Sequence, residues 1–290
     1  MDSVLVAARL VHYAAAIQLL GGAAFYTLLV PAGLRPTMRG PTHALEIASA
    51  TAVLLSGMAW LMATAATMGD GPQDALNLGV IGTVLISTEF GRVWGPRLIL
   101  CALAVVAALP RADWARWAGL VISTLVLGSL GLVGHAAIDS GVMGALNELS
   151  QALHLLSSGF WLGALLPLLY LLALFRHPDT EREAGRALRR FSGLGHYAVA
   201  VLLLTGVANT WFVIGDRVTL AAPYQQLLVL KIALAGGMCL LAIVNRYAFM
   251  PRIRNGGSGA RQLARGTIAE IVLGAIILGL VAVLGTMPPS

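Results

Sequence analysis

The first apolar stretch, VLVAARLVHYAAAIQLLGGAAFYTLLV at residues 4–30, decides the fold class. It carries a single charged residue, Arg9, and is longer than the about 20 apolar residues that cross a bilayer as a helix. The run is also too long for a signal peptide, and no small-residue cleavage site follows it. We therefore expect residues 4–30 to form a transmembrane helix.

Seven further stretches of this kind follow along the chain, so the sequence predicts an all-α integral membrane protein with eight transmembrane helices. The 290 residues are 58% hydrophobic and only 11% charged, which excludes an ordinary soluble domain. The expected spans are residues 4–30, 44–68, 92–110, 117–135, 147–175, 191–214, 224–249 and 264–286.

A ninth apolar piece, ALNLGVIGTVLIST at residues 75–88, is too short to cross, and the charges support this interpretation. Fourteen of the 19 lysines and arginines lie in the connections at 31–43, 110–117, 176–190 and 246–266, which the positive-inside rule places in the cytoplasm. These four connections all lie on the same side of the membrane only if residues 75–88 form a non-crossing helix on the outer side. Both termini are then periplasmic, and the net charge of +6 anchors the inner face, so no nucleic-acid partner is expected.

An internal repeat organises the eight spans. The segment HYAAAIQLLGG at 12–22 resembles HLLSSGFWLGA at 154–164, and LLSGMAW at 54–60 resembles LLTGVANTW at 203–211. Further pairs in the same order are Phe90 and Arg97 with Tyr224 and Lys231, and LVGH at 132–135 with VLGT at 283–286. We predict two parallel four-helix repeats, residues 1–142 and 143–290, although apolar helices can also resemble one another through composition alone.

Histidines near the outer side are the main candidate ligands. His12 and His154 each lie about eight residues inside a span, at equal depth, and His135 ends the fourth span close to Asp139. Ionisable side chains inside a membrane are usually functional, and imidazole binds both copper and haem iron. The sequence predicts a metal site of three histidines, the alternative being that each imidazole is hydrogen-bonded to a neighbouring helix.

Thioether sulfur suits Cu(I), so Met68 and Met287, both expected on the outer side, are further candidate metal ligands, although methionine more often fills cores. Arg97 and Lys231 are cations at equivalent repeat positions just inside the outer face, where function and snorkelling explain them equally well. Glu270 lies inside the last span, where Arg246 or Arg265 is the expected partner and Asn245 could join the network.

The ordered motifs resemble the copper resistance protein D (CopD) family of bacterial inner-membrane proteins over nearly the whole chain. The matching elements are LVHYAAAIQLLGG (10–22), TEFGRVWGPR (88–97), GHAA (134–137), ALHLLSSGFWLGALLPL (152–168), RFSGLGHYAV (190–199), LTGVANTW (204–211), YQQLLVLK (224–231), NRYAFMPRI (245–253) and LGTMPP (284–289).

The resemblance implies copper transport and homeostasis at the inner membrane, with copper taken from the periplasmic side. His12, His135 and His154 match the outward histidines of that family, which often works with a periplasmic copper-binding protein of the CopC type. This chain has no fused copper-binding domain and no histidine-rich tail, so capture of copper would depend on such a partner. No phosphate-binding loop is present and Lys231 is the single lysine, so ATP-driven pumping is not expected and the protein is predicted not to be an enzyme.

Two other functions remain open from the sequence. His12 and His154 could ligate one haem b axially, with Arg97 and Lys231 near its propionates, in an electron-transfer protein. Alternatively, the chain is an assembly or docking subunit for a periplasmic copper chaperone.

Overall fold

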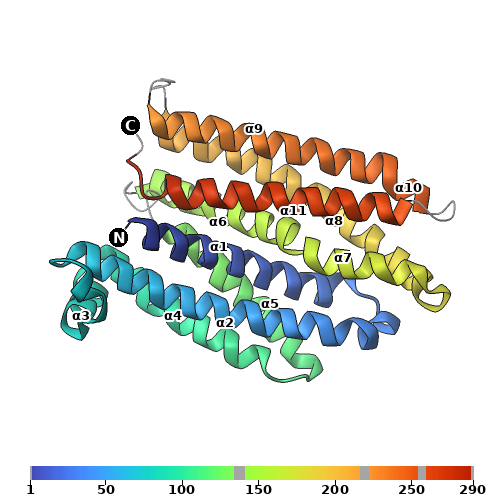
Figure 1. Ribbon diagram of the computed structural model, residues 1–290, viewed down its shortest axis with the longest axis horizontal. Coiled ribbons are helices and arrows are strands. Elements are labelled where there is room, and N and C mark those ends of the chain that lie inside the picture. Colours follow the sequence, from blue (N-terminus) through green and yellow to red (C-terminus); the bar gives the residue numbers. More distant parts are fainter. Residues whose placement is uncertain (1, 134–140, 216–221, 254–258, 289–290) are drawn as a thin grey trace.

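The computed structural model describes residues 2–133, 141–215, 222–253 and 259–288. Every regular element in these ranges is helical, and eight helical segments are long and apolar enough to cross a membrane (Figure 1). This confirms the predicted all-α membrane fold. The segments are Ser3–Leu29, Ala32–Met68, Glu89–Ala108, Asp113–Leu132, Gly141–Ala173, Pro178–Ile214, Pro223–Ile253 and Gly259–Leu284.

Ten α-helices build the eight segments in the described ranges. They are α1 (Asp2–Ala24), α2 (Arg35–Met68), α4 (Glu89–Ala108), α5 (Asp113–Gly128), α6 (Gly141–Gly163), α7 (Leu165–Ala173), α8 (Pro178–Ile214), α9 (Pro223–Val244), α10 (Met250–Ile253) and α11 (Gly259–Leu284). The segments also contain the short turns of helix η1 (Phe25–Leu29), η2 (Ala32–Leu34), η4 (Ser129–Leu132) and η7 (Asn245–Phe249). Three further elements lie between the segments, namely η3 (Pro72–Leu76), α3 (Leu78–Ser87) and η6 (Leu174–Arg176).

The short helix α3 confirms that residues 75–88 do not cross. Its ten residues span about 15 Å, half the thickness of the hydrocarbon core. Asn77 caps its first turn by accepting hydrogen bonds from the backbone N–H groups of Gly79 and Val80, and Thr88 caps α4 in the same way through Gly91. In Figure 1, α3 lies at the end of the bundle where α1 begins and α11 ends.

Two of the predicted connections between spans are largely helical. Helix α2 begins at Arg35, within the predicted connection 31–43, and α8 begins at Pro178, within 176–190. Both have proline in the first turn, where its missing N–H costs nothing, and α8 adds Asp179 and Glu181 beside the positive end of the helix dipole. Hydropathy marks the part of a helix in lipid, so it missed these polar extensions.

Helices α1 and α6 cross at two glycines. A Cβ atom on Gly21 would collide with the backbone of Gly163, so only glycine allows this close approach. Directly after the crossing, Pro167 has no N–H to donate to the carbonyl of Gly163, and α6 gives way to α7. The side chain of Gln18 donates to that carbonyl at 2.9 Å. The first and second halves of the chain are thus joined through a contact that needs Gly21, Gly163 and Gln18.

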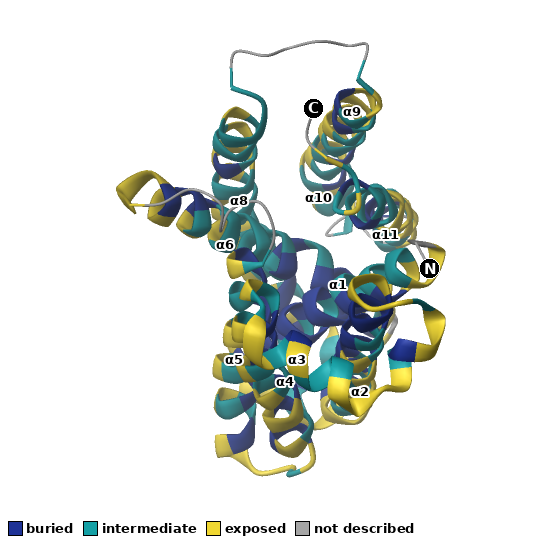
Figure 2. Cartoon of the chain, turned by 90° about the vertical axis from the view of Figure 1, so that its left-hand side faces the viewer, coloured by how far each residue is buried: buried dark blue, intermediate teal, exposed yellow. Residues whose placement is uncertain are grey.

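Packing is uneven around the bundle. Helix α2 packs against both α1 and α4, and α8 packs against α6. By contrast, α8 and α9 are not among the helix pairs in close contact within the described ranges, and they lie apart in Figure 2. They are also the least buried of the eight spans, which leaves one side of the second half open.

Candidate functional site

His12 on α1 is completely buried, and both of its ring nitrogens have partners. Nδ1 lies 3.1 Å from the carbonyl oxygen of Val53 and 3.0 Å from Oγ of Ser56, both on α2. Nε2 lies 2.7 Å from Nη2 of Arg97. Because a guanidinium can only donate, Nε2 is the acceptor, and a neutral ring then carries its proton on Nδ1.

Arg97 on α4 is 1% exposed and connects three parts of the first half. Its Nη1 donates to the carbonyl of Val126 and to Oγ of Ser129, both at 2.6 Å, while Nη2 reaches His12. In the described part of the chain no carboxylate lies within ion-pair distance of this guanidinium. The charge is therefore held by neutral acceptors, which explains Arg97 better than snorkelling does, since its head points inward and is buried.

Aromatic rings enclose the histidine. Trp60 and Trp94 stand with ring centroids 5.7 and 5.4 Å from that of His12, and 4.5 Å from each other. The indole N–H of Trp94 donates to the carbonyl of Gly57 at 3.0 Å. A Cβ atom on Gly57 would lie 3.3 Å from Cε1 of His12, so the glycine makes room for the ring. Sequence reasoning missed the two tryptophans, although Trp94 precedes Arg97 by three residues, on the same helix face.

His154 on α6 occupies a similar position in the second half. Its Nδ1 lies 3.1 Å from Oγ1 of Thr205 on α8, and a Cβ atom on Gly206 would lie 3.5 Å from its Cε1. Lys231 on α9 is the counterpart of Arg97, but no hydrogen bond joins it to His154 in the described residues. Of the two histidines, His12 is thus the one that is hydrogen-bonded to the cation of its own half. His154 is less enclosed than His12, being partly exposed.

The neighbours of the two histidines correspond in sequence as well. Ser56 and Gly57 beside His12 have Thr205 and Gly206 as counterparts beside His154, which are the motifs that the repeat paired. These contacts show that the surroundings of the two histidines are similar, but they do not test where the first repeat ends. The division of the chain between residues 142 and 143 therefore stays a prediction.

In the described residues no contact joins the other predicted ligands to these histidines. His135 and Asp139 lie outside the described residues. The side chain of Met68, at the end of α2, is exposed, and Met287 follows the end of α11. Within the described ranges no three His, Cys, Asp or Glu side chains are grouped closely enough to hold a metal ion. The ligand set of His12, His135, His154, Met68 and Met287 therefore stays a prediction.

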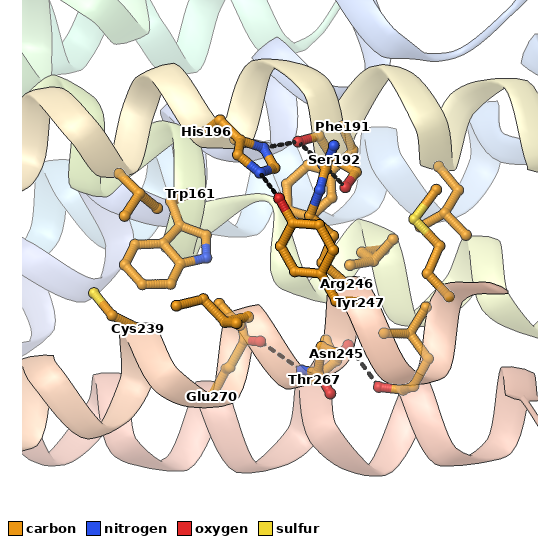
Figure 3. Close-up of a pocket in the computed structure, with 18 of the residues that line it drawn as sticks. Trp161, Phe191, Ser192, His196, Cys239, Asn245, Arg246, Tyr247, Thr267 and Glu270 are labelled. Carbon is orange, nitrogen blue, oxygen red and sulfur yellow. Dashed lines mark hydrogen bonds between the residues drawn. The ribbon is translucent and has the colours of Figure 1, made fainter. Parts of the chain in front are cut away.

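Glu270 belongs to a different part of the molecule. It is 4% exposed on α11, and its Oε1 accepts a hydrogen bond of 2.6 Å from Nδ2 of Asn245 (Figure 3). Arg246, at the same end of the bundle, donates instead to Ser192. The expected contact of Glu270 with Asn245 is thus confirmed, whereas the described residues show no ion pair between Glu270 and Arg246 or Arg265.

Comparison with known proteins identifies the family. Residues 1–145 match the family described as copper resistance protein D-like, N-terminal domain, and residues 185–284 match the copper resistance protein D family. The chain belongs to the copper resistance protein D family. Two matches thus cover most of this CopD-family chain, and both halves of the bundle contain one.

Several curated relatives support the same conclusion. This CopD-family chain is 30% identical to the inner membrane protein YebZ of Escherichia coli (strain K12), over 98% of each chain. It is 32% identical to copper resistance protein D of Pseudomonas syringae pv. tomato, over 71% of each chain. It is also 29% identical to the copper transport protein CutJ of Bacillus subtilis (strain 168), over 78% of this chain and 42% of the relative. No solved structure matches the chain.

Family and fold together make this a multi-pass inner-membrane protein with a copper-related function. Two of these three relatives are named as copper resistance and copper transport proteins.

Proposed function

We propose that this protein transports copper across the bacterial inner membrane, taking the ion from the periplasmic side through His12 and His154. The observation that carries the proposal is the pair of intramembrane histidines at corresponding places, with His12 bonded to Ser56 and Arg97 and His154 bonded to Thr205. Ionisable groups are expensive in hydrocarbon, and two of them at corresponding places are more than packing requires. Family membership supplies copper as the cargo.

Arg97 is hydrogen-bonded to the ring nitrogen of His12 that copper would bind. Its Nη2 donates to Nε2 of His12, and the same lone pair is the one an ion would bind. Two cations a few ångströms apart in a buried site repel each other strongly. We therefore propose that copper replaces the Arg97 head at His12.

The remaining predicted ligands complete the proposal on the outer side. His135, with Asp139, and the thioethers of Met68 and Met287 would receive copper before it reaches His12 and His154. A separate periplasmic protein of the CopC type would deliver the ion. Both termini are placed in the periplasm by the same orientation, which rests on the arginine distribution.

The test is copper accumulation in cells that express His12→Ala, His135→Ala or His154→Ala, with His177→Ala as the control. His177 is exposed at the start of α8 and contacts neither His12 nor His154 in the described residues. Each of the three site variants should lower accumulation, and the control should not. Unchanged accumulation in all three would refute the site. An absorption spectrum of the purified protein with a Soret band would favour the haem alternative instead.

A further inference from the structure

A cavity of about 460 Å³ lies in the second half, between α8, α9, η7 and α11 (Figure 3). Most of its wall is apolar, including Val199, Leu203 and Ala242, and polar groups gather along one part of it. Its volume is in the range of small-molecule binding sites. It lies away from His12 and His154, near the arginine-rich end of the helices, so the proposed copper site does not use it.

The first half has almost no space at the corresponding place. A cavity of only about 30 Å³ remains there, lined by Thr42, His43, Glu46 and Arg111 among others. Their counterparts by the repeat, namely Phe191, Ser192, Gly195 and Asn245, all line the larger cavity.

One exchange accounts for much of the difference between the two cavities. Gly195 is the counterpart of Glu46 in the repeat, because the two are separated by the same number of residues as the paired glycines Gly57 and Gly206. Glu46 fills its space by packing against Gly119 of α5, whereas a Cβ atom on Gly195 would meet nothing within 4 Å. The large cavity is thus particular to the second half.

The cavity opens toward lipid. The flanking helices α8 and α9 diverge, and large apolar side chains on both are exposed, among them Leu204, Val207 and Leu240. In a membrane these surfaces contact acyl chains, so a molecule dissolved in the bilayer can enter sideways between the two helices. A water-soluble ligand would have no such route through this wall.

Arg246 gives the cavity a positive charge. Its Nη1 donates to the backbone oxygen and the hydroxyl of Ser192, and its guanidinium carbon lies 5.5 Å from the ring centroid of Tyr247. In the described ranges no carboxylate forms an ion pair with it, because Glu270 bonds to Asn245. The other guanidinium N–H groups have no hydrogen-bond partner among the described residues, and the hydroxyl of Tyr247 lies 3.3 Å from Nε2 of His196.

We propose that this cavity binds an anionic phospholipid from the leaflet at the arginine-rich end, with the phosphate on Arg246 and one acyl chain in the apolar part. A basic pocket between transmembrane helices is a known form of lipid headgroup site. The positive-inside rule makes this the cytoplasmic leaflet. The lipid would fill the space that Glu46 and its neighbours fill in the first half and so join α8 to α9.

The test is native mass spectrometry of the full-length protein, stripped of lipid in detergent and titrated with phosphatidylglycerol or phosphatidylcholine. The wild type should retain one phosphatidylglycerol in preference to phosphatidylcholine. Arg246→Gln should lower that retention about fivefold, the effect of one basic residue near a lipid phosphate. The matched control is Arg252→Gln, since Arg252 is exposed on α10 and does not line the cavity.

A second pair of variants tests the volume of the cavity. Gly195→Leu should fill it and reduce retention, whereas Gly193→Leu should not, because Gly193 faces equally open space on the same helix but is not in the cavity wall. Both changes replace glycine in a helix and so should preserve folding, which elution as a single peak from a sizing column would verify. Equal retention of the two lipids, equal loss in Arg246→Gln and Arg252→Gln, or a lipid-free dimer joined through α8 and α9 would each overturn the proposal.

Discussion

Nη2 of Arg97 donates a 2.7 Å hydrogen bond to Nε2 of His12 in the interior of a transmembrane bundle, with no carboxylate within ion-pair distance in the described residues. The pair joins α1 to α4, and through Val126 and Ser129 it also joins α5 and η4. Each partner therefore satisfies a buried group of the other, and the two should depend on each other energetically.

The first prediction is a double-mutant cycle on this pair. His12→Ala leaves the guanidinium without one acceptor in a buried place, which should cost about 1–3 kcal/mol of stability. Arg97→Gln removes the charge, so His12→Ala should cost less in that background. Unfolding in detergent should give a coupling of about 1 kcal/mol or more. Additive losses would mean that the hydrogen bond contributes nothing.

The second prediction concerns the glycine crossing of α1 and α6. Gly21→Ala places a methyl group against the backbone of Gly163 and should destabilise the fold by about 1–3 kcal/mol, the usual cost of overpacking. Gly22→Ala is the matched control, since its Cβ atom would meet only Nε2 of Gln18, at 3.6 Å. The apparent Tm in detergent should fall for the first variant alone. A similar Tm for both would show that the crossing can open without cost.

The third prediction isolates the bond between Gln18 and the carbonyl of Gly163. Gln18→Leu should destabilise by about 1 kcal/mol or more, because Pro167 cannot donate to this carbonyl. In a Pro167→Ala background the alanine N–H can donate, so the same change should cost less. Thermal unfolding of the four proteins measures this difference. An equal loss in both backgrounds would mean that Gln18 acts only through packing.

The fold could be predicted from the sequence because two features of a membrane protein are strong signals, namely the long apolar runs and the distribution of arginines. Long apolar runs must be helical, and the arginines excluded residues 75–88 from crossing, as α3 confirms. Because each span is apolar on all sides, its hydropathy does not indicate which face of the helix packs against which neighbour. Nothing in the hydropathy pattern says that Arg97 points at His12 rather than toward the membrane surface, or that Trp60 and Trp94 enclose the ring. Those contacts come from packing between helices distant in sequence.

The repeat carried more information about the site than the histidines alone. It paired Arg97 with Lys231 and His12 with His154, and the structure places Arg97 on His12 and the corresponding Ser56 and Thr205 on the two histidines. It did not predict the large cavity, because the exchange of Glu46 for Gly195 is a departure from the repeat.

The last prediction tests whether Arg97 competes with copper. If copper must displace the guanidinium from Nε2 of His12, Arg97→Gln removes a repulsive charge from a buried site and should raise copper retention by the purified protein at least about tenfold. The gain should vanish in the double variant with His12→Ala, since the ligand is then missing. Arg9→Gln is the control: Arg9 lies over Trp60 of the same aromatic cluster, with its guanidinium carbon 4.7 Å from the ring centroid, but bonds to Gly285 and Tyr13 rather than to His12. Equilibrium dialysis followed by elemental analysis measures the copper bound. A fall in retention for Arg97→Gln would show that the guanidinium supports the ion instead of competing with it, and the exchange step would have to be abandoned.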